Sequence, residues 1–293
     1  MAIREITAQG IEALNLATRL LQRSRCADPY EGIWEAADIQ WSWRTPRDSD
    51  NVNKTFWIDE NGPVAGIWLT SSAGNQWQID PIVVPHQTDI EPEIVWNTTL
   101  GIIADHPDRS FDVPVANNNP LFQQLAKASG LAPSDEDFTG WMNASVVPAP
   151  AEISDGFTLV DRTMRGDTPH PMSGRNGEHI SSRLQQCSLY DPSMDLSIES
   201  SDGDVAGYSL YWFDPVTRVG VVEPVRVHDD FQRRGLARAM VTHGIDRLIA
   251  KGAERIKVSW ETEAAGALYL GVGFQQQSET TWYSTPTREK TTD

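Results

Sequence analysis

The sequence contains few cysteines and no apolar run long enough to span a membrane. Only Cys26 and Cys187 occur in 293 residues. They lie far apart and outside any motif, so we expect two reduced, partly buried thiols rather than a disulfide framework or a catalytic thiol. A signal peptide begins with basic residues that are followed by apolar ones, whereas this chain has an acidic residue, Glu5, in that region. These absences predict a cytoplasmic protein without a membrane segment.

Basic residues are also scarce. The chain has 24 Lys and Arg against 41 Asp and Glu, which gives a net charge of −17. Such a surface repels nucleic acid and anionic membranes and favours cationic or neutral partners. The 6 histidines are scattered without the paired helical spacing of a zinc site. We therefore expect no metal, no nucleic-acid partner and no membrane partner.

Two common phosphate-binding templates are missing: the sequence has neither Gly-x-x-x-x-Gly-Lys-Ser/Thr nor Gly-x-Gly-x-x-Gly. What is present is a β-branched segment, 220–227, interrupted by Pro224, then a polar loop, then an amphipathic segment that predicts a helix from Leu236 to about Lys251. The proline predicts a bulged or splayed strand. A loop with glycine and flanking arginines at a helix N-terminus suits a phosphate group.

The loop Gln232-Arg233-Arg234-Gly235-Leu236-Ala237 fits the pattern Gln/Arg-x-x-Gly-x-Gly/Ala, and it resembles the pyrophosphate loop of the GNAT superfamily of acyl-CoA N-acyltransferases. Downstream, the strand pattern 256–260 and the run 265–274, with Leu-Tyr-x-x-x-Gly-Phe, also resemble that superfamily. One position departs from it, because Thr262 stands where the family often has Asn. The resemblance implies acetyl-CoA as the acyl donor.

The resemblance also implies the site residues. The cofactor-binding set lies on the strand before the loop, on the loop and helix start, and at the cofactor exit: Val225, Arg226, Val227, Gln232, Arg233, Arg234, Gly235, Leu236, Ala237, Arg238 and Thr262. Tyr269 is the candidate general acid, since the family's phenol at this place lies near the cofactor sulfur. Glu223 is the candidate general base, with a raised pKa if it is buried.

Each of these residues also has a structural interpretation. Tyr269 would serve equally as a half-buried aromatic that anchors its helix. Glu223 would serve as an edge or salt-bridged carboxylate. Arg233 and Arg238 would serve as solvated charges at a helix start, and Thr262 would lie on the surface.

The first half of the chain repeats the order of elements of the second. A strand at 3–7, a helix at 10–23, a hairpin at 54–70, a strand at 76–84, a helix at 91–104, a strand at 110–115 and a helix at 119–131 have counterparts in order. A repeat of this length indicates duplication. The first half lacks the loop, however: 86–93 holds several acids and neither glycine nor arginine, and Ala126 takes the place of Tyr269. We expect a degenerate copy that binds no CoA by this route.

The predicted fold is α/β (an α+β mixed sheet), with two tandem GNAT-fold domains, each a twisted mixed sheet flanked by helices. The expected boundaries are 1–145 and 153–293, joined by a proline-rich linker at 146–152. The second domain is expected to open with a strand at 157–163 and a helix at about 178–190, and to end with a strand at 279–284 and a fraying tail at 285–293. The tryptophan-rich segment 26–50 predicts a helix and loop around a substrate-side cleft.

The function expected from these features is acetyl-CoA-dependent N-acetylation of a primary amine on a small, cationic or polar molecule by the C-terminal domain. Two alternatives stay open. The tandem arrangement with a degenerate first copy also resembles mycothiol synthase, which would imply acetylation of a cysteinyl pseudodisaccharide. A non-catalytic acyl-CoA-binding protein would keep the loop without turnover.

Overall fold

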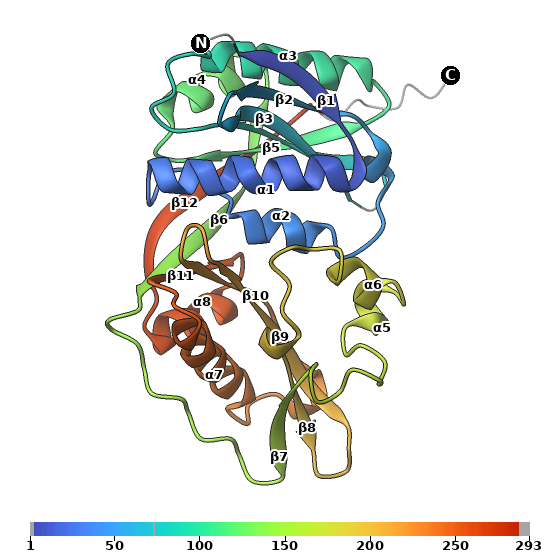
Figure 1. Ribbon diagram of the computed structural model, residues 1–293, viewed down its shortest axis with the longest axis vertical. Helices are drawn as coiled ribbons and strands as arrows, with labels where there is room; N and C mark the ends of the chain where they lie inside the picture. Colours follow the sequence, from blue (N-terminus) through green and yellow to red (C-terminus); the bar gives the residue numbers. More distant parts are fainter. Residues whose placement is uncertain (1–2, 73, 287–293) are drawn as a thin grey trace. The chain divides into compact units, whose positions relative to one another are not determined.

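The computed structural model describes residues 3–72 and 74–286, and the chain divides into two compact units (Figure 1). Unit 1 comprises Met1–Ala36, Arg47–Asp137 and Ser278–Asp293, and unit 2 comprises Ala37–Pro46 and Phe138–Gln277. This division departs from the linear boundaries at 145 and 153. A short early segment belongs to unit 2, and the C-terminal segment belongs to unit 1.

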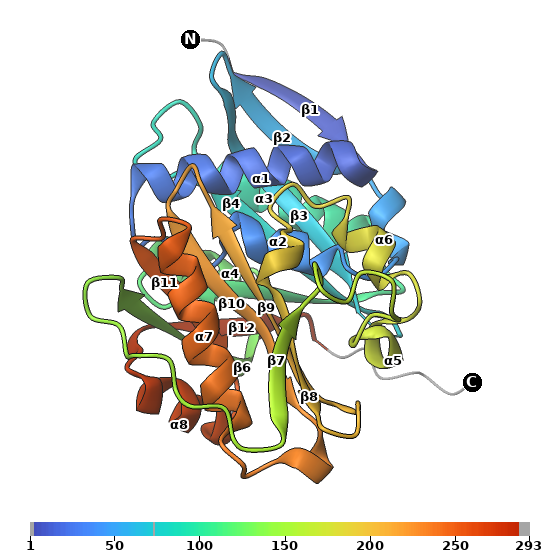
Figure 2. The same ribbon diagram turned by 60° about the horizontal axis from the view of Figure 1, so that its bottom comes forward.

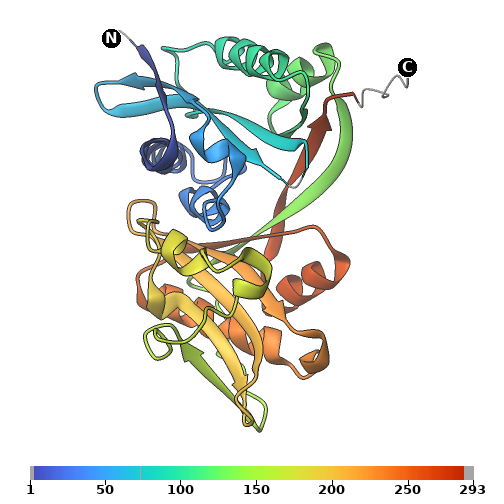
Figure 3. The ribbon, with the colours of Figure 1, turned by 90° about the vertical axis from the view of Figure 1, so that its right-hand side faces the viewer.

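Unit 1 is a mixed sheet with strand order β1-β2-β3-β4-β5-β12. Only β4 and β5 run parallel. Helix α1 covers one face and α3 the other (Figure 3). The elements are β1 (Arg4–Ala8), α1 (Gly10–Ala27), η1 (Asp48–Asn51), β2 (Lys54–Asp59), β3 (Gly62–Ser71), β4 (Gln76–Val83), α3 (Pro92–Asp105), β5 (Ser110–Ala116), α4 (Pro120–Ala128) and parts of β6 (Ala132–Asn143) and β12 (Gln275–Ser284).

Unit 2 has the strand order β6-β11-β10-β9-β8-β7, with only β10 and β11 parallel. Helix α7 lies along β9 and β10 (Figure 2). Its elements, besides parts of β6 and β12, are α2 (Ala36–Ser42), β7 (Phe157–Asp161), α5 (Ser173–Asn176), α6 (Ile180–Leu184), η2 (Pro192–Met194), β8 (Asp195–Ser200), β9 (Val205–Asp214), β10 (Val219–Val227), η3 (Asp229–Phe231), α7 (Leu236–Ala250), β11 (Arg255–Trp260) and α8 (Glu263–Val272).

Each unit has its own apolar core. Ile67, Trp96 and Phe111 are fully buried in unit 1, and Tyr211 and Ile245 are fully buried in unit 2. Burying one such side chain stabilises the folded state by about 1.5–3 kcal/mol relative to leaving it exposed to water. In unit 2 the packing of α7 on β9 requires Gly244, because a Cβ there would lie 2.0 Å from the Tyr211 ring.

The two halves of the sequence exchange strand segments. The β6 residues Phe138–Asn143 pair with β11 in unit 2. The β12 residues Thr280–Ser284 pair with β5 in unit 1. Each segment covers a sheet edge whose N–H and C=O groups would otherwise lack partners. A strand over 132–143 was not predicted, because its first half reads Ala-Pro-Ser-Asp-Glu-Asp and is polar and exposed.

The predicted mixed sheets, hairpins and repeated order of elements are confirmed, but two details are wrong. The helix expected over about 178–190 spans only five residues, Ile180–Leu184. The residues that follow form turns, with the Cys187 N–H donating to the Leu184 carbonyl over 2.9 Å, and the Leu189 N–H donates to Gln40 Oε1 over 2.8 Å. Cys26 is exposed rather than partly buried, whereas burial raises the pKa of the Cys187 thiol to about 12.

Part of the expected fraying tail, 287–293, lies outside the described residues. Within 3–72 and 74–286, no helix has the length and apolarity needed to cross a membrane. Residues 146–152, expected as a linker, form neither helix nor strand. They are tied to α7, because the Ala151 N–H donates to Thr242 Oγ1 over 2.9 Å.

Candidate active site

The site begins where β10 separates from β11. The two strands pair only through Val219–Val221 and Arg255–Lys257. On the other side of β10, the pairing with β9 shifts register between Val222 and Val225. The bulge predicted from Pro224 is thus confirmed. It places Glu223 at the irregularity and leaves the Val225–Val227 segment paired to β9.

The loop after β10 leads into the N-terminus of α7. Gly235 precedes the helix with φ +75°, a left-handed conformation in which glycine carries no Cβ penalty. Nothing lies within 4 Å of the position that a Cβ would take, so the loop faces open space. The first helical bond is from the Ala239 N–H to the Gly235 carbonyl, at 3.0 Å. The preceding N–H groups, from Leu236 to Arg238, therefore remain for an anion.

The loop side chains differ in how they are held. Gln232 Nε2 donates to Asp229 Oδ1 over 3.0 Å. Arg238 Nη1 donates to the Gly271 carbonyl of α8 over 2.9 Å. The Arg234 guanidinium lies 5.7 Å from the centre of the Phe231 ring. Arg233 is exposed, with φ +63°. The loop thus presents several cations beside the free amides of α7.

A buried donor on β10 adds to this arrangement. Arg226 Nε is buried and has no hydrogen-bond partner among the described residues. A buried donor without a partner is costly, and a ligand acceptor would relieve it. Together these features fit the pyrophosphate and the pantetheine arm of an acyl-CoA. They are the open space at Gly235, the free amides of α7, the exposed arginines and the Arg226 donor.

Glu223 is half-buried at the bulge. Its backbone carbonyl accepts a 2.8 Å hydrogen bond from the Trp212 indole, which fixes the strand at this point. Desolvation, together with the neighbouring charge of Asp38, raises the pKa of the Glu223 carboxyl to about 7. A carboxyl with a pKa near 7 is suited to accept a proton at neutral pH.

Three residues that act on the Glu223 carboxyl come from the first half of the sequence. The Trp41 side chain makes a hydrogen bond with Glu223, Arg44 lowers its pKa by charge, and Asp38 raises it. The sequence predicted a helix and loop at a substrate-side cleft from the tryptophan-rich segment 26–50, but it did not single out these three residues. The signal available was the run Trp41-Ser42-Trp43-Arg44, which has two indoles beside a cation.

Several contacts within unit 2 hold α2 and the residues after it in place. Lys257 Nζ of β11 donates to Asp38 Oδ2 over 2.8 Å, and the lysine is 2% exposed. Gln40 Nε2 donates to Ser188 Oγ over 2.8 Å. The Trp43 indole donates to Gln186 Oε1 over 2.8 Å. This network positions Trp41 and Arg44 at Glu223.

Tyr269 lies on α8 and is buried. Its ring contacts Trp260 and Phe274, with centroids 6.1 Å and 6.0 Å away. Burial raises the pKa of the Tyr269 phenol, and the charge of Glu223 raises it further. The two predicted catalytic residues are therefore electrostatically coupled, and the phenol is protonated at neutral pH.

Thr262 begins α8 and acts as its cap. Its Oγ1 accepts from the Ala265 N–H over 3.3 Å. The residue is exposed. This contact accounts for Thr262 at the N-cap position, where threonine is preferred.

Replacing Trp41 with phenylalanine is expected to shift the acid limb of the pH profile of kcat/KM to higher pH by about one unit. The indole hydrogen bond favours the ionised carboxylate and lowers the Glu223 pKa. Its loss raises that pKa, so a higher pH is needed to form the base. The profile is measured from pH 5.5 to 9. An acid limb at the same pH as in the native chain would show that the Trp41 hydrogen bond does not act on the group that titrates.

Known proteins share this fold. Residues 161–274 match the Acetyltransferase (GNAT) family. A tandem GNAT protein from the clavulanic acid biosynthesis pathway is 12% identical with a TM-score of 0.67, and the match covers 98% of this chain and 100% of that one. A GCN5-related N-acetyltransferase from Sphaerobacter thermophilus is 16% identical with a TM-score of 0.62, and the match covers 96% of this chain and 95% of that one. The curated proteins contain no match to this chain.

Proposed function

We propose that unit 2, in which residues 161–274 match the Acetyltransferase (GNAT) family, transfers an acetyl group from acetyl-CoA to a primary amine of a small cationic or polar molecule. The observation that carries the proposal is the placement of Glu223. A carboxyl with a pKa of about 7 lies at the β10 bulge, on the strand that leads into the anion-binding loop and α7.

The acyl donor is held along β10 and at the start of α7. The N–H groups from Leu236 to Arg238 and the exposed Arg233 receive the pyrophosphate. Arg226 Nε supplies a further donor. The backbone of Val225 and Val227 pairs with the pantetheine arm and polarises the acyl carbonyl. These contacts orient the thioester for attack.

The reaction removes two protons from the acceptor nitrogen and supplies one to the leaving thiolate. Glu223, directly or through a water molecule, accepts the first proton from the ammonium form of the acceptor. The free amine attacks the thioester carbonyl, the C–N bond forms, and the C–S bond breaks as Tyr269 donates its proton to the departing thiolate. The nitrogen then passes its second proton, directly or through water, to the Tyr269 phenolate, which restores the phenol. The products are the acetylated amine, CoA and one proton, which Glu223 releases to solvent.

The surroundings of Glu223 favour a cationic acceptor. Asp38 and Glu261 add negative charge at the carboxyl, Arg44 adds positive charge, and Trp41 adds an aromatic surface. Because Asp38 is paired with Lys257, the Glu223 carboxylate and the Trp41 indole are the groups that attract an ammonium ion before it loses its proton. A cysteinyl pseudodisaccharide, the acceptor in the mycothiol synthase-type alternative, also presents a primary amine and belongs in the same acceptor screen.

Replacing Tyr269 with phenylalanine is expected to lower kcat by about 10²-fold or more while leaving the Kd for acetyl-CoA little changed, because the phenol acts on the leaving thiolate rather than on binding. Release of CoA is followed with a thiol reagent, and Kd by calorimetry. Tyr283→Phe, which removes the hydroxyl of a buried tyrosine in unit 1, is the matched control. Full turnover in the Tyr269 variant would remove its role as the acid, and absence of turnover in the native chain with every amine would favour a non-catalytic acyl-CoA-binding protein.

A further inference from the structure

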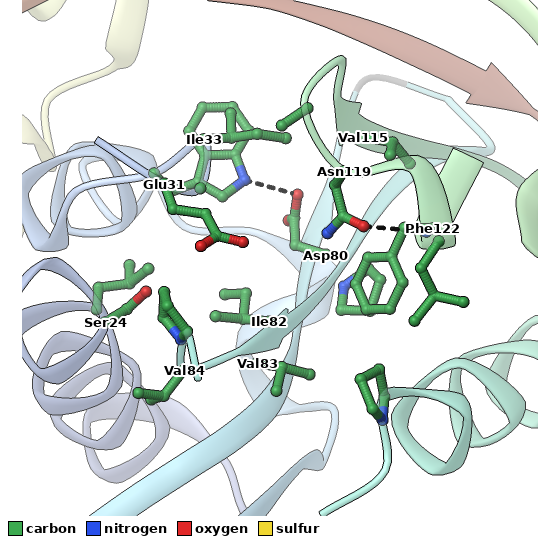
Figure 4. Close-up of a pocket in the computed structure, with 18 of the residues that line it drawn as sticks. Ser24, Glu31, Ile33, Asp80, Ile82, Val83, Val84, Val115, Asn119 and Phe122 are labelled. Atoms are coloured by element: carbon green, nitrogen blue, oxygen red, sulfur yellow. Dashed lines mark hydrogen bonds between the residues drawn. The ribbon is translucent and has the colours of Figure 1, made fainter. Parts of the chain in front are cut away.

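Unit 1 contains a cavity of about 250 Å³ where β4 separates from β5 (Figure 4). The two strands pair only through Gln76–Gln78 and Ser110–Asp112, the same three-residue pairing that β10 and β11 make. Beyond that pairing, residues of β4, β5, α1 and α4 line the cavity, together with the segment 31–34. It therefore occupies the place in unit 1 that corresponds to the candidate site in unit 2.

A buried carboxyl group lines this cavity. Asp80 is 2% exposed and precedes Pro81, as Glu223 precedes Pro224. Its Oδ1 accepts 2.9 Å hydrogen bonds from the Trp34 indole and from Gln78 Nε2, and its Oδ2 accepts a 3.0 Å bond from Gln78 Nε2. Both donors are neutral. Desolvation raises the pKa of Asp80 to about 7.

The ionisable side chains that line the cavity are acids, apart from His86. Among the described lining residues there is no lysine and no arginine, whereas Glu31 faces the same space as Asp80 (Figure 4). At the rim, Asp28, Glu31 and His86 bring possible ligand atoms within 4.8 Å of one another. An anion is therefore excluded, and burying an ionised carboxyl here without a cation is costly.

Part of the remaining lining is apolar, beside the polar residues Ser24, His86, Gln87 and Asn119. Ile82, Val84, Leu121 and Phe122 contribute the hydrophobic walls. The segment after β4 carries Asp89, Glu91 and Glu93 and no arginine, so it offers nothing to a pyrophosphate. The cavity suits a ligand with one cationic head, one apolar body and no phosphate.

We propose that unit 1 binds a small organic ammonium ion in this cavity, with Asp80 as the counter-ion of its N–H groups and the apolar walls around its body. The site is separate from the proposed acetyl-transfer site in unit 2. Unit 1, which lacks the pyrophosphate loop, thus binds a ligand of its own. The binding residue is the acid that precedes a proline in both copies of the duplicated strand.

Binding of a cation at Asp80 also has a proton signature. Burial raises the pKa of the Asp80 carboxyl to about 7 and so favours its protonated form, whereas a cation beside it favours the ionised form. Binding therefore releases protons, and the calorimetric heat depends on the ionisation enthalpy of the buffer. Glu31 and His86 are the other titratable groups that line the cavity, so variants at each position identify the source of the proton.

The test is calorimetric titration of 2-phenylethylamine and its neutral analogue 2-phenylethanol into the full chain without acetyl-CoA. EDTA keeps divalent ions away from the Asp28, Glu31 and His86 cluster. The amine is expected to bind at one site with proton release, and the alcohol to bind about 10- to 100-fold more weakly, as expected for loss of a charged hydrogen bond. Equal binding of the two compounds, or no binding of the amine, overturns the proposal.

Variants locate the site. Asp80→Asn is expected to abolish binding and proton release, whereas Glu31→Gln retains the proton release. Leu121→Trp, which enlarges a lining side chain and leaves Asp80 unchanged, is expected to abolish binding as well, and it tests the site if the asparagine variant unfolds. Glu223→Gln distinguishes this site from the acetyl-transfer site: amine binding that survives Asp80→Asn but is lost in Glu223→Gln places the amine in unit 2 and overturns the proposal.

Discussion

Replacing Glu223 with glutamine is expected to lower kcat/KM for acetyl transfer by about 10²- to 10⁴-fold, the usual contribution of a positioned general base. Glutamine keeps the size of the side chain and accepts the Trp41 hydrogen bond, but it takes no proton from the amine. In the native chain, kcat/KM rises as pH increases through about 7, because the base is the ionised form. The glutamine variant is expected to lose this rise.

Two controls accompany the Glu223 variant. Glu178→Gln changes an exposed glutamate on the same unit and is expected to leave kcat/KM unchanged. The Kd for acetyl-CoA of the Glu223 variant is expected to match that of the native chain, since Glu223 acts on the acceptor. Native turnover in the glutamine variant would show that another group, or solvent, accepts the proton.

Replacing Gly235 with glutamate is expected to weaken acetyl-CoA binding by about 100-fold or more, because like charges brought together cost several kcal/mol. The new carboxylate points into the open space before α7, where no atom lies within 4 Å of the Cβ position. The left-handed backbone adds about 1–2 kcal/mol of strain for a residue with a side chain. The Kd for acetyl-CoA measures the effect.

Gly235→Asn separates the charge from the strain. Asparagine tolerates φ values near +75°, the value at this position, and carries no charge. It is expected to lose much less affinity than the glutamate variant. Equal losses in both would mean that shape rather than charge controls the loop, and no loss in either would place the pyrophosphate elsewhere.

Much of unit 2 could be predicted because its signals are local. The loop from Gln232 to Ala237, the proline in β10 and the apolar stripe of α7 lie within one continuous stretch. The proline acts directly on strand pairing and the apolar stripe on helix packing, so the bulge at Glu223-Pro224 and α7 follow from the sequence. The loop predicts an anion site by the same kind of local argument, whereas the left-handed conformation of Gly235 was not predicted.

The parts that escaped prediction depend on contacts distant in sequence. Asp38 and Trp41 act on Glu223 across about 180 residues of sequence. The exchange of β6 and β12 between the units likewise depends on which edge is free for pairing, which a linear pattern does not encode. Beyond the short α6, the Leu189 backbone bonds to Gln40, a residue about 150 positions earlier in the sequence.

Comparison of the duplicated strands shows how the two units diverged. Both keep an acid before a proline just beyond the parallel pairing, Asp80 in β4 and Glu223 in β10, and both carboxyls have a pKa of about 7. Only unit 2 has the arginine loop that follows. An acid thus precedes a proline in both copies. We propose that the charge of the loop that follows determines which ligand binds beside the acid.

The most direct test of the account is calorimetric titration of acetyl-CoA into the full chain, which measures affinity and stoichiometry together. We predict one saturable site per chain, located in unit 2 and lost in Gly235→Glu. Absence of saturable binding would contradict the acetyltransferase proposal, and two sites per chain would contradict the assignment of acetyl-CoA binding to unit 2 alone.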